Sequence, residues 1–119
     1  MEGVGDCFDS WAVDGIRSFK WHKNLLGGRQ EWGVKWVQGD VIGIACNMLT
    51  RQMLVSLNGD YKEPNGVVFD LPHTALVMYP ALFSSDDCHV HVNLGHAPFK
   101  HAHPSQVCEA RRCITAAQY

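Results

Sequence analysis

The sequence has few charged residues, which argues against a disordered chain, and no long hydrophobic run, which argues against a membrane-spanning protein. Charged residues make up 18% of the chain and hydrophobic residues 46%, a balance that supports a buried core and argues against intrinsic disorder. The formal net charge of −2 argues against a basic surface for nucleic acid or anionic lipid. No apolar run approaches the roughly 20 residues needed to cross a bilayer, and no basic and apolar secretory signal opens the chain. The 119 residues suit one domain with one modest core.

The cysteines lack the spacing of a metal-binding or redox pair. The chain has five, an odd number, and none forms a Cys-x-x-Cys motif. Without a signal sequence, this favours reduced thiols in a cytosolic or nuclear compartment, and we expect a cytoplasmic protein. Cys46 and Cys88 lie inside strand-like runs, where a buried structural thiol is the expected role.

What the sequence does have is short β-branched and aromatic runs separated by turn residues. Residues 40–48 are apolar almost throughout, which is typical of a strand covered on both faces. Residues 52–57 follow with partial alternation, and the two runs are expected to pair as an antiparallel hairpin closed near residues 49–51. Asn58-Gly59 then predicts a turn, because both residues tolerate positive φ.

More short strands are predicted on both sides of this hairpin, and a short helix only near the C-terminus. Pro80 places the run 76–83 at a sheet edge or a bulge. The clean alternation of residues 88–94 predicts one apolar and one polar face. Many short strands with regular turn signals predict an all-β fold, an antiparallel sandwich or barrel. The further strands are residues 10–13 and 17–22, as a hairpin around Asp14-Gly15, then 67–69, 76–83 with Pro80, and the alternating run 88–94, and the candidate helix is 107–118.

Seven short motifs carry a family resemblance. They are Ser10-Trp11-Ala12-Val13-Asp14-Gly15, Lys20-Trp21-His22, residues 36–43, Leu57-Asn58-Gly59, Tyr79-Pro80-Ala81, Val92-Asn93-Leu94-Gly95 and Pro98-Phe99-Lys100. As an ordered set over roughly residues 5–101 they resemble a SPRY domain, closest to those of ryanodine receptors and large RING or HECT ubiquitin ligases. The resemblance implies an antiparallel β-sandwich of the concanavalin-like jelly-roll type. It places the SPRY domain at residues 1–104 and leaves 105–119 as a helical or disordered tail.

The chain departs from the family pattern at its start and in its central hairpin. A family domain opens with further strands before the Ser-Trp-Ala segment, which here begins at residue 10. We therefore expect the C-terminal two-thirds of a SPRY domain, truncated at the N-terminus, with apolar edges left unpaired. Asn47 stands where many relatives carry an acidic residue.

The resemblance also implies a partner-binding surface formed by three loops. A tryptophan and a tyrosine there would offer rigid contact area, and aspartates could meet a basic or amide group of a peptide. The alternative is that Trp21 belongs to the core and Tyr61 is a turn aromatic; Trp11, Trp32 and Trp36 are expected in the core. The residues implied in partner binding are Trp21, then Gly59, Asp60 and Tyr61, then Ser84, Ser85 and Asp86.

The sequence contains residue types that could bind a metal or catalyse a reaction, but not in the patterns that such sites require. His89 and His91 share one face of a predicted strand, and His96, His101 and His103 follow, but no carboxylate or cysteine stands at a familiar ligand spacing. Ser10, His22 and Asp14 include the residue types of a catalytic triad without a nucleophile elbow. Gly27-Gly28 lacks the rest of a phosphate-binding loop. We expect no metal, no cofactor and no enzymatic activity.

The sequence therefore predicts a protein-interaction module that binds a short peptide or a partner domain through loops at one end of a β-sandwich. The alternative is a structural piece of a larger channel or ubiquitin ligase that contacts neighbouring domains of the same protein. Either way the expected partner is a protein or peptide, and neither nucleic-acid binding nor membrane insertion is expected.

Overall fold

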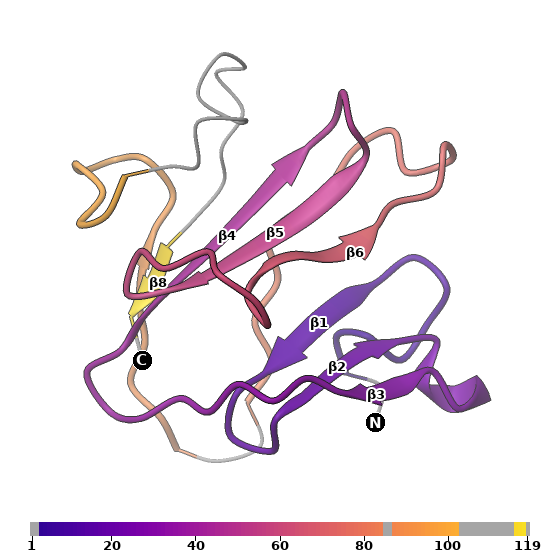
Figure 1. Ribbon diagram of the computed structural model, residues 1–119, viewed down its shortest axis with the longest axis horizontal. Helices are drawn as coiled ribbons and strands as arrows, with labels where there is room; N and C mark the ends of the chain where they lie inside the picture. The colour runs from indigo at the N-terminus through magenta and orange to yellow at the C-terminus, as the bar shows by residue number, and fades with distance from the viewer. Residues whose placement is uncertain (1–2, 85–86, 103–115, 119) are drawn as a thin grey trace. The chain divides into compact units, whose positions relative to one another are not determined.

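The computed structural model describes residues 3–84, 87–102 and 116–118 and divides the chain into two units (Figure 1). The first unit comprises Met1–Val37 with Ala81–Cys88, and the second comprises Gln38–Pro80 with His89–Tyr119. Each contains one sheet in which all paired strands are antiparallel. The predicted all-β antiparallel class is confirmed, and the presence of two sheets is consistent with a β-sandwich. In the described part of the chain, no helix is long and apolar enough to span a membrane.

The first unit contains a three-stranded sheet in the order β1-β2-β3, formed by β1 (Trp11–Asp14), β2 (Phe19–His22) and β3 (Arg29–Glu31). The β1–β2 hairpin is the one predicted, and its turn is closed by Asp14, whose Oδ1 accepts the backbone N–H groups of Ile16 and Arg17 at 2.9 and 3.0 Å. A short 3-10 helix, η1 (Asn24–Leu26), leads into β3. β3 was not predicted, because its three residues are polar and exposed and show no alternation.

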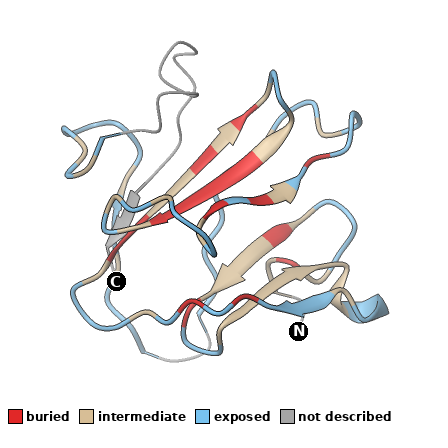
Figure 2. Ribbon diagram, viewed as in Figure 1, coloured by how far each residue is buried: buried red, intermediate tan, exposed pale blue. Residues whose placement is uncertain are grey.

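The second unit is built on the predicted central hairpin, β4 (Val41–Asn47) and β5 (Gln52–Leu57). Four consecutive residues of β5, Met53–Ser56, are buried, so both faces of this strand are covered where the sequence predicted partial alternation (Figure 2). Covered faces were predicted for β4, whose residues are all buried or half-buried. At the connection, Oδ1 of the buried Asn47 accepts the N–H groups of Leu49 and Thr50 at 3.0 and 3.1 Å. A neutral amide thus performs the turn-closing role of an aspartate.

The Asn58-Gly59 turn is confirmed in detail. Both residues have positive φ, 52° and 81°, and Leu57 and Asp60 exchange backbone hydrogen bonds across them, which is the geometry of a two-residue hairpin turn. Asn58 also binds the start of β4, because its Oδ1 accepts the N–H of Val41 at 2.8 Å and its Nδ2 donates to Asp40 at 2.8 Å. The chain continues into β6 (Gly66–Asp70), which pairs with β5.

The remaining strands differ from the prediction. Residues 76–83 form no strand, and their side chains include some of the most exposed apolar groups, such as Leu76 at 75% and Tyr79 at 82%. Pro80 removes one donor that a strand partner would need. The alternating run 88–94 shortens to β7 (His91–Asn93), which has no buried residue, and Cys88 is exposed rather than buried.

At the C-terminus, β8 (Ala116–Gln118) replaces the end of the predicted helix. It pairs with both β4 and β7, which gives the sheet order β6-β5-β4-β8-β7. The small Ala117 stands opposite Ile42 and Val92, so strand pairing overrides the weak local preference for helix. Residues 103–115 lie outside the described part, and the boundary of the tail at residue 105 stays a prediction.

Candidate functional site

Trp21, the first residue predicted to bind a partner, lies half-buried on β2. The strand alternation places Trp21 and Phe19 on one sheet face and His22 on the other, where the buried Trp11 stacks on it with ring centroids 4.8 Å apart. Trp11 and Trp32 are buried at 8% and 6% exposure, as expected of core residues, whereas Trp36 is half-buried. Trp21 is therefore on the opposite sheet face from the core tryptophan of the same hairpin.

Two guanidinium groups lie over the aromatic rings of this face. Cζ of Arg17 is 4.8 Å from the Trp21 ring centroid, and Cζ of Arg29 is 4.6 Å from that of Phe19 and 5.8 Å from that of Trp21. The Phe19 and Trp21 rings meet edge to face at 5.8 Å. We call these four residues the Trp21 cluster. Such cation–π contacts hold long, flexible side chains over rigid rings.

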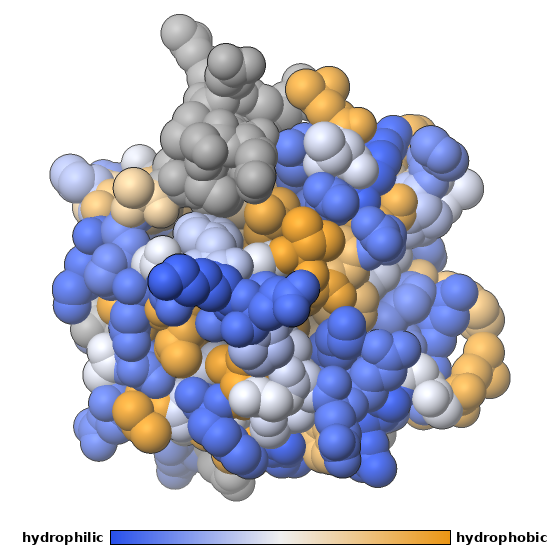
Figure 3. Space-filling view, in the orientation of Figure 1, coloured by the Kyte–Doolittle hydropathy of each residue, from blue (hydrophilic) through white to orange (hydrophobic). Residues whose placement is uncertain are grey.

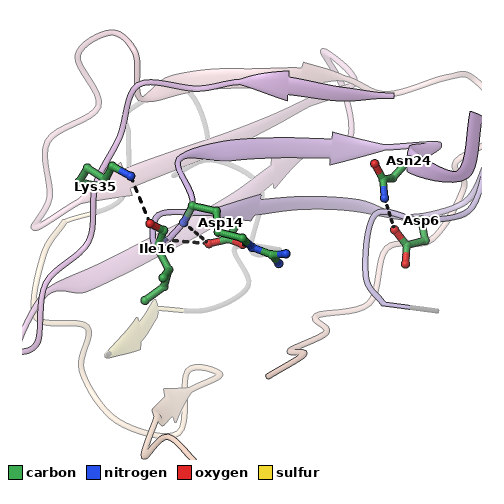
Figure 4. Close-up of polar contacts among 6 residues, drawn as sticks. Asp6, Asp14, Ile16, Asn24 and Lys35 are labelled. Atoms are coloured by element: carbon green, nitrogen blue, oxygen red, sulfur yellow. Dashed lines mark hydrogen bonds and ion pairs between the residues drawn. The ribbon is translucent and has the colours of Figure 1, made fainter. Parts of the chain in front are cut away.

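One of the two arginines is already paired with a carboxylate. Nε of Arg17 donates to Oδ2 of Asp14 at 2.6 Å, and Figure 4 shows the Asp14 carboxylate beside Ile16, whose carbonyl accepts from Nζ of Lys35 at 3.2 Å. Asp14 thus both closes the β1–β2 turn and forms an ion pair with Arg17. This exposed ion pair lies at one side of the Trp21 cluster.

The same unit contains a second well-bonded carboxylate. Asp6 accepts the backbone N–H of Gly3 at 2.7 Å and a side-chain N–H of Asn24 at 3.0 Å (Figure 4). The backbone bond, followed by the Asn24 bond, lowers the pKa of Asp6, because both donors favour the charged form. Asp6 therefore binds the N-terminal loop to η1.

The second predicted loop, Gly59 to Tyr61, belongs to the other unit. Tyr61 is half-buried and packs against Ala45 and Leu54, so its ring contributes to the core of that unit. The His101 ring lies against Gly59, since a Cβ built on the glycine would be 2.9 Å from it. Asp60 is exposed, and its Oδ1 accepts the N–H of Lys62 at 2.9 Å. In this loop Asp60 is the residue most accessible to a partner.

Of the third loop, only Ser84 lies within the described residues; Ser85 and Asp86 lie outside them. Ser84 is exposed, and its Oγ accepts a hydrogen bond from Sγ of Cys88 at 3.1 Å. Trp21 and Ser84 belong to the first unit and Gly59–Tyr61 to the second. A pocket formed by all three loops stays a prediction.

The two arginines of the Trp21 cluster were not among the predicted site residues. Arg17, Phe19 and Trp21 recur at every second residue, and on a strand over 17–22 this spacing would have indicated a shared face, although Arg17 lies in the turn before β2. No such signal existed for Arg29, because its position opposite Trp21 depends on the β2–β3 register. The β2–β3 register depends on which strands pair, and a short stretch of sequence does not show it.

The histidines, cysteines and carboxylates of the described residues do not gather into a metal site. No group of three His, Cys, Asp or Glu side chains there could hold a metal ion; His89 and His91 are exposed, and His103 lies outside. Burial raises the pKa of the half-buried Cys46 thiol, which keeps it protonated and poorly nucleophilic. Figure 3 shows hydrophobic residues among hydrophilic ones on the face that it draws.

The chain is similar in sequence to a segment of a curated ubiquitin ligase. The chain is 35% identical over 108 residues to "E3 ubiquitin-protein ligase RKP" of Arabidopsis thaliana. The aligned region covers 85% of this chain but 8% of the ligase, so the chain spans only a small part of that relative. No protein-family model matches the chain, and no solved structure matches it.

Proposed function

We propose that the chain is a SPRY-type protein-interaction module that binds a short peptide or a partner domain through its loops. The observation that carries this proposal is the position of Trp21, which reaches the surface beside two guanidinium groups on the sheet face opposite Trp11. A rigid indole at a surface offers large contact area with little loss of conformational entropy on binding, which is why tryptophan and arginine are enriched among the residues that dominate binding energy.

The similarity to one segment of a ubiquitin ligase supports a role inside a larger protein of that kind. A protein or peptide partner fits this context, and a nucleic-acid partner does not fit the net charge of −2. We place the protein in the cytoplasm, on the sequence argument from its cysteines.

The module has no catalytic activity of its own in this proposal. Ser10, His22 and Asp14, which have the residue types of a catalytic triad, support the absence of catalysis, because the side chain of each contacts a group other than its triad neighbour. Nδ1 of His22 is 2.9 Å from the backbone oxygen of Ser10, Oγ of Ser10 accepts the N–H of Gly5 at 2.8 Å, and Asp14 pairs with Arg17. A hydroxyl–imidazole–carboxylate chain is not assembled among them.

The test is retention of a displayed library of short random peptides by the immobilised protein. We expect Trp21→Ala to reduce retention by about tenfold or more, since truncating a central aromatic removes at least about 2 kcal/mol of binding energy. Tyr61→Phe removes only a hydroxyl and keeps the ring on Ala45 and Leu54, so it tests the second loop without opening the core.

The matched control is Leu25→Ala, which truncates an apolar side chain that is 63% exposed in the same unit. It should retain peptides as the wild type does. Unchanged retention by both Trp21→Ala and Tyr61→Phe would remove the proposed surface. Failure of the wild type to retain any peptide would reject the peptide-binding function itself.

A second candidate function is contact with neighbouring domains of a larger protein. The observation that favours it is the restriction of the similarity to 8% of a long ligase. Cross-linking of a full-length relative would distinguish the two, because this candidate requires cross-links from Trp21-cluster residues to other segments of the same chain.

A further inference from the structure

The two arginines of the Trp21 cluster differ in how their charge is satisfied. Arg17 is bonded to Asp14 at 2.6 Å. Arg29 is exposed and touches the Phe19 and Trp21 rings, and within the described residues it has no carboxylate at ion-pair distance. The cluster thus presents one neutralised and one unneutralised guanidinium on the same sheet face.

The ring contacts of Arg29 leave its hydrogen-bonding capacity unused. A cation over a ring interacts through the ring quadrupole, and the N–H donors of the guanidinium remain available. A guanidinium presents these donors in a planar fork that matches the two oxygens of a carboxylate. Two aromatic rings hold the fork in place, so less side-chain entropy is lost when an anion binds.

The charges around Arg29 favour a single negative charge over a multiply charged ligand. Glu31 lies on the same face of β3, two residues from Arg29 and opposite Phe19, and Asp14 is committed to Arg17. The face therefore carries one unneutralised cation next to one acidic side chain, in a chain of net charge −2. A phosphate dianion or a nucleic-acid backbone would be repelled by Glu31 more strongly than a monoanionic carboxylate.

We propose that Arg29 receives the side-chain carboxylate of an Asp or Glu in a partner peptide, with the edges of Phe19 and Trp21 contacting the residue next to it. The partner is thus an acidic peptide with an apolar neighbour to its acidic residue. This inference rests on the proposed peptide-binding function and adds the chemistry of the peptide to it.

The test uses three libraries of short peptides that are random except at a fixed central residue: glutamate, glutamine or phosphoserine. The wild-type protein should retain the glutamate library about tenfold better than the glutamine library, since a hydrogen bond to a charged group is stronger than one between neutral groups. Arg29→Gln should abolish that preference, and Arg29→Lys should retain only part of it, because a point charge replaces the fork.

The control is Lys20→Gln, which removes one positive charge from the same strand on the opposite sheet face. It should keep the glutamate preference, and all variants should show the wild-type circular dichroism spectrum. Equal retention of the glutamate and glutamine libraries, or a preference that survives Arg29→Gln, would overturn the assignment of Arg29 while leaving peptide binding intact. Stronger retention of the phosphoserine library would overturn the choice of carboxylate. Retention of no library would reject the proposed peptide binding, and the inference with it.

Discussion

The two sheets are stabilised by different kinds of side chain. In the sheet of the second unit, the centre of β5 is buried without interruption over Met53–Ser56, and Val55 is fully buried. In the sheet of the first unit, Trp11 is the one buried strand residue, and β3 is exposed throughout (Figure 2). One sheet is held by aliphatic burial, whereas the other depends on indole stacking, guanidinium contacts and side-chain hydrogen bonds.

This difference shows where a binding surface can exist without loss of stability. A strand whose two faces are covered, such as the centre of β5, has no side chain to offer a partner, and a substitution there costs packing. A sheet held by contacts among half-exposed aromatic and charged groups can present those same groups to a ligand. The Trp21 cluster has this character, and Tyr61, packed on Ala45 and Leu54, does not.

The largest expected effect comes from removing aliphatic volume in the second unit. Leu54, at 3% exposure, contacts the Ala45 and Tyr61 cluster. We expect Leu54→Ala to lower the free energy of unfolding by about 2–5 kcal/mol, through lost burial and the cavity left behind. Urea unfolding followed by far-ultraviolet circular dichroism measures this.

Leu76→Ala is the matched control, because it makes the same truncation on a side chain that is 75% exposed. Its effect should stay within about 0.5 kcal/mol. Equal losses for the two variants would contradict the burial contrast on which the comparison depends.

A smaller effect is expected from crowding an indole in the first unit. Gly15 lies directly under Trp36, and a Cβ at this position would be 2.1 Å from Cγ of that ring. Gly15→Ala should displace the indole and destabilise the protein by about 1–3 kcal/mol, the usual cost of overpacking. Near-ultraviolet circular dichroism and the urea midpoint report both changes.

Gly3→Ala provides the comparison, since its added methyl group would meet Phe83 at an ordinary 3.4 Å. It should leave both readings close to those of the wild type. If Gly15→Ala were equally silent, the Trp36 packing would contribute little, and the first unit would depend on its hydrogen bonds instead.

The elements that could be predicted are those whose sequence pattern is local. The β4–β5 hairpin follows from two apolar runs, and the next turn follows from the ability of Asn58 and Gly59 to adopt positive φ. The β1–β2 hairpin follows in the same way from an aspartate that closes its own turn. In each case one short segment contains both the strand signal and the turn signal.

The errors arise where structure depends on a distant partner. Residues 76–83 have the composition of a strand but no partner strand within the described part of the chain, whereas the alanine-rich β8 is a strand because β4 and β7 flank it. For the same reason the family resemblance could imply Trp21 as a candidate binding residue, whereas nothing in the sequence pointed to Arg29, which meets Trp21 through the β2–β3 register. The binding role of Trp21 stays a prediction, and register decides which side chains lie beside it.

The smallest expected effect is electrostatic and concerns Asp6. Its pKa is lowered in the folded state by the bonds from Gly3 and Asn24. A carboxylate of this kind stabilises the fold at pH values above its unfolded pKa, about 3.9, and loses that contribution as the pH falls through its folded pKa. The difference in urea midpoint between the wild type and Asp6→Asn should be constant from neutral pH to about pH 5 and shrink below about pH 4.

Asp9→Asn is the control for this measurement, because it removes a nearby negative charge that has neither of those two hydrogen bonds. Its difference from the wild type should be smaller than that of Asp6→Asn at neutral pH. A wild-type advantage over Asp6→Asn that persisted unchanged to pH 3 would mean that the loop is held by the shape of the side chain and not by its charge. The first unit would then resemble the second more closely, with packing as the main source of stability in both.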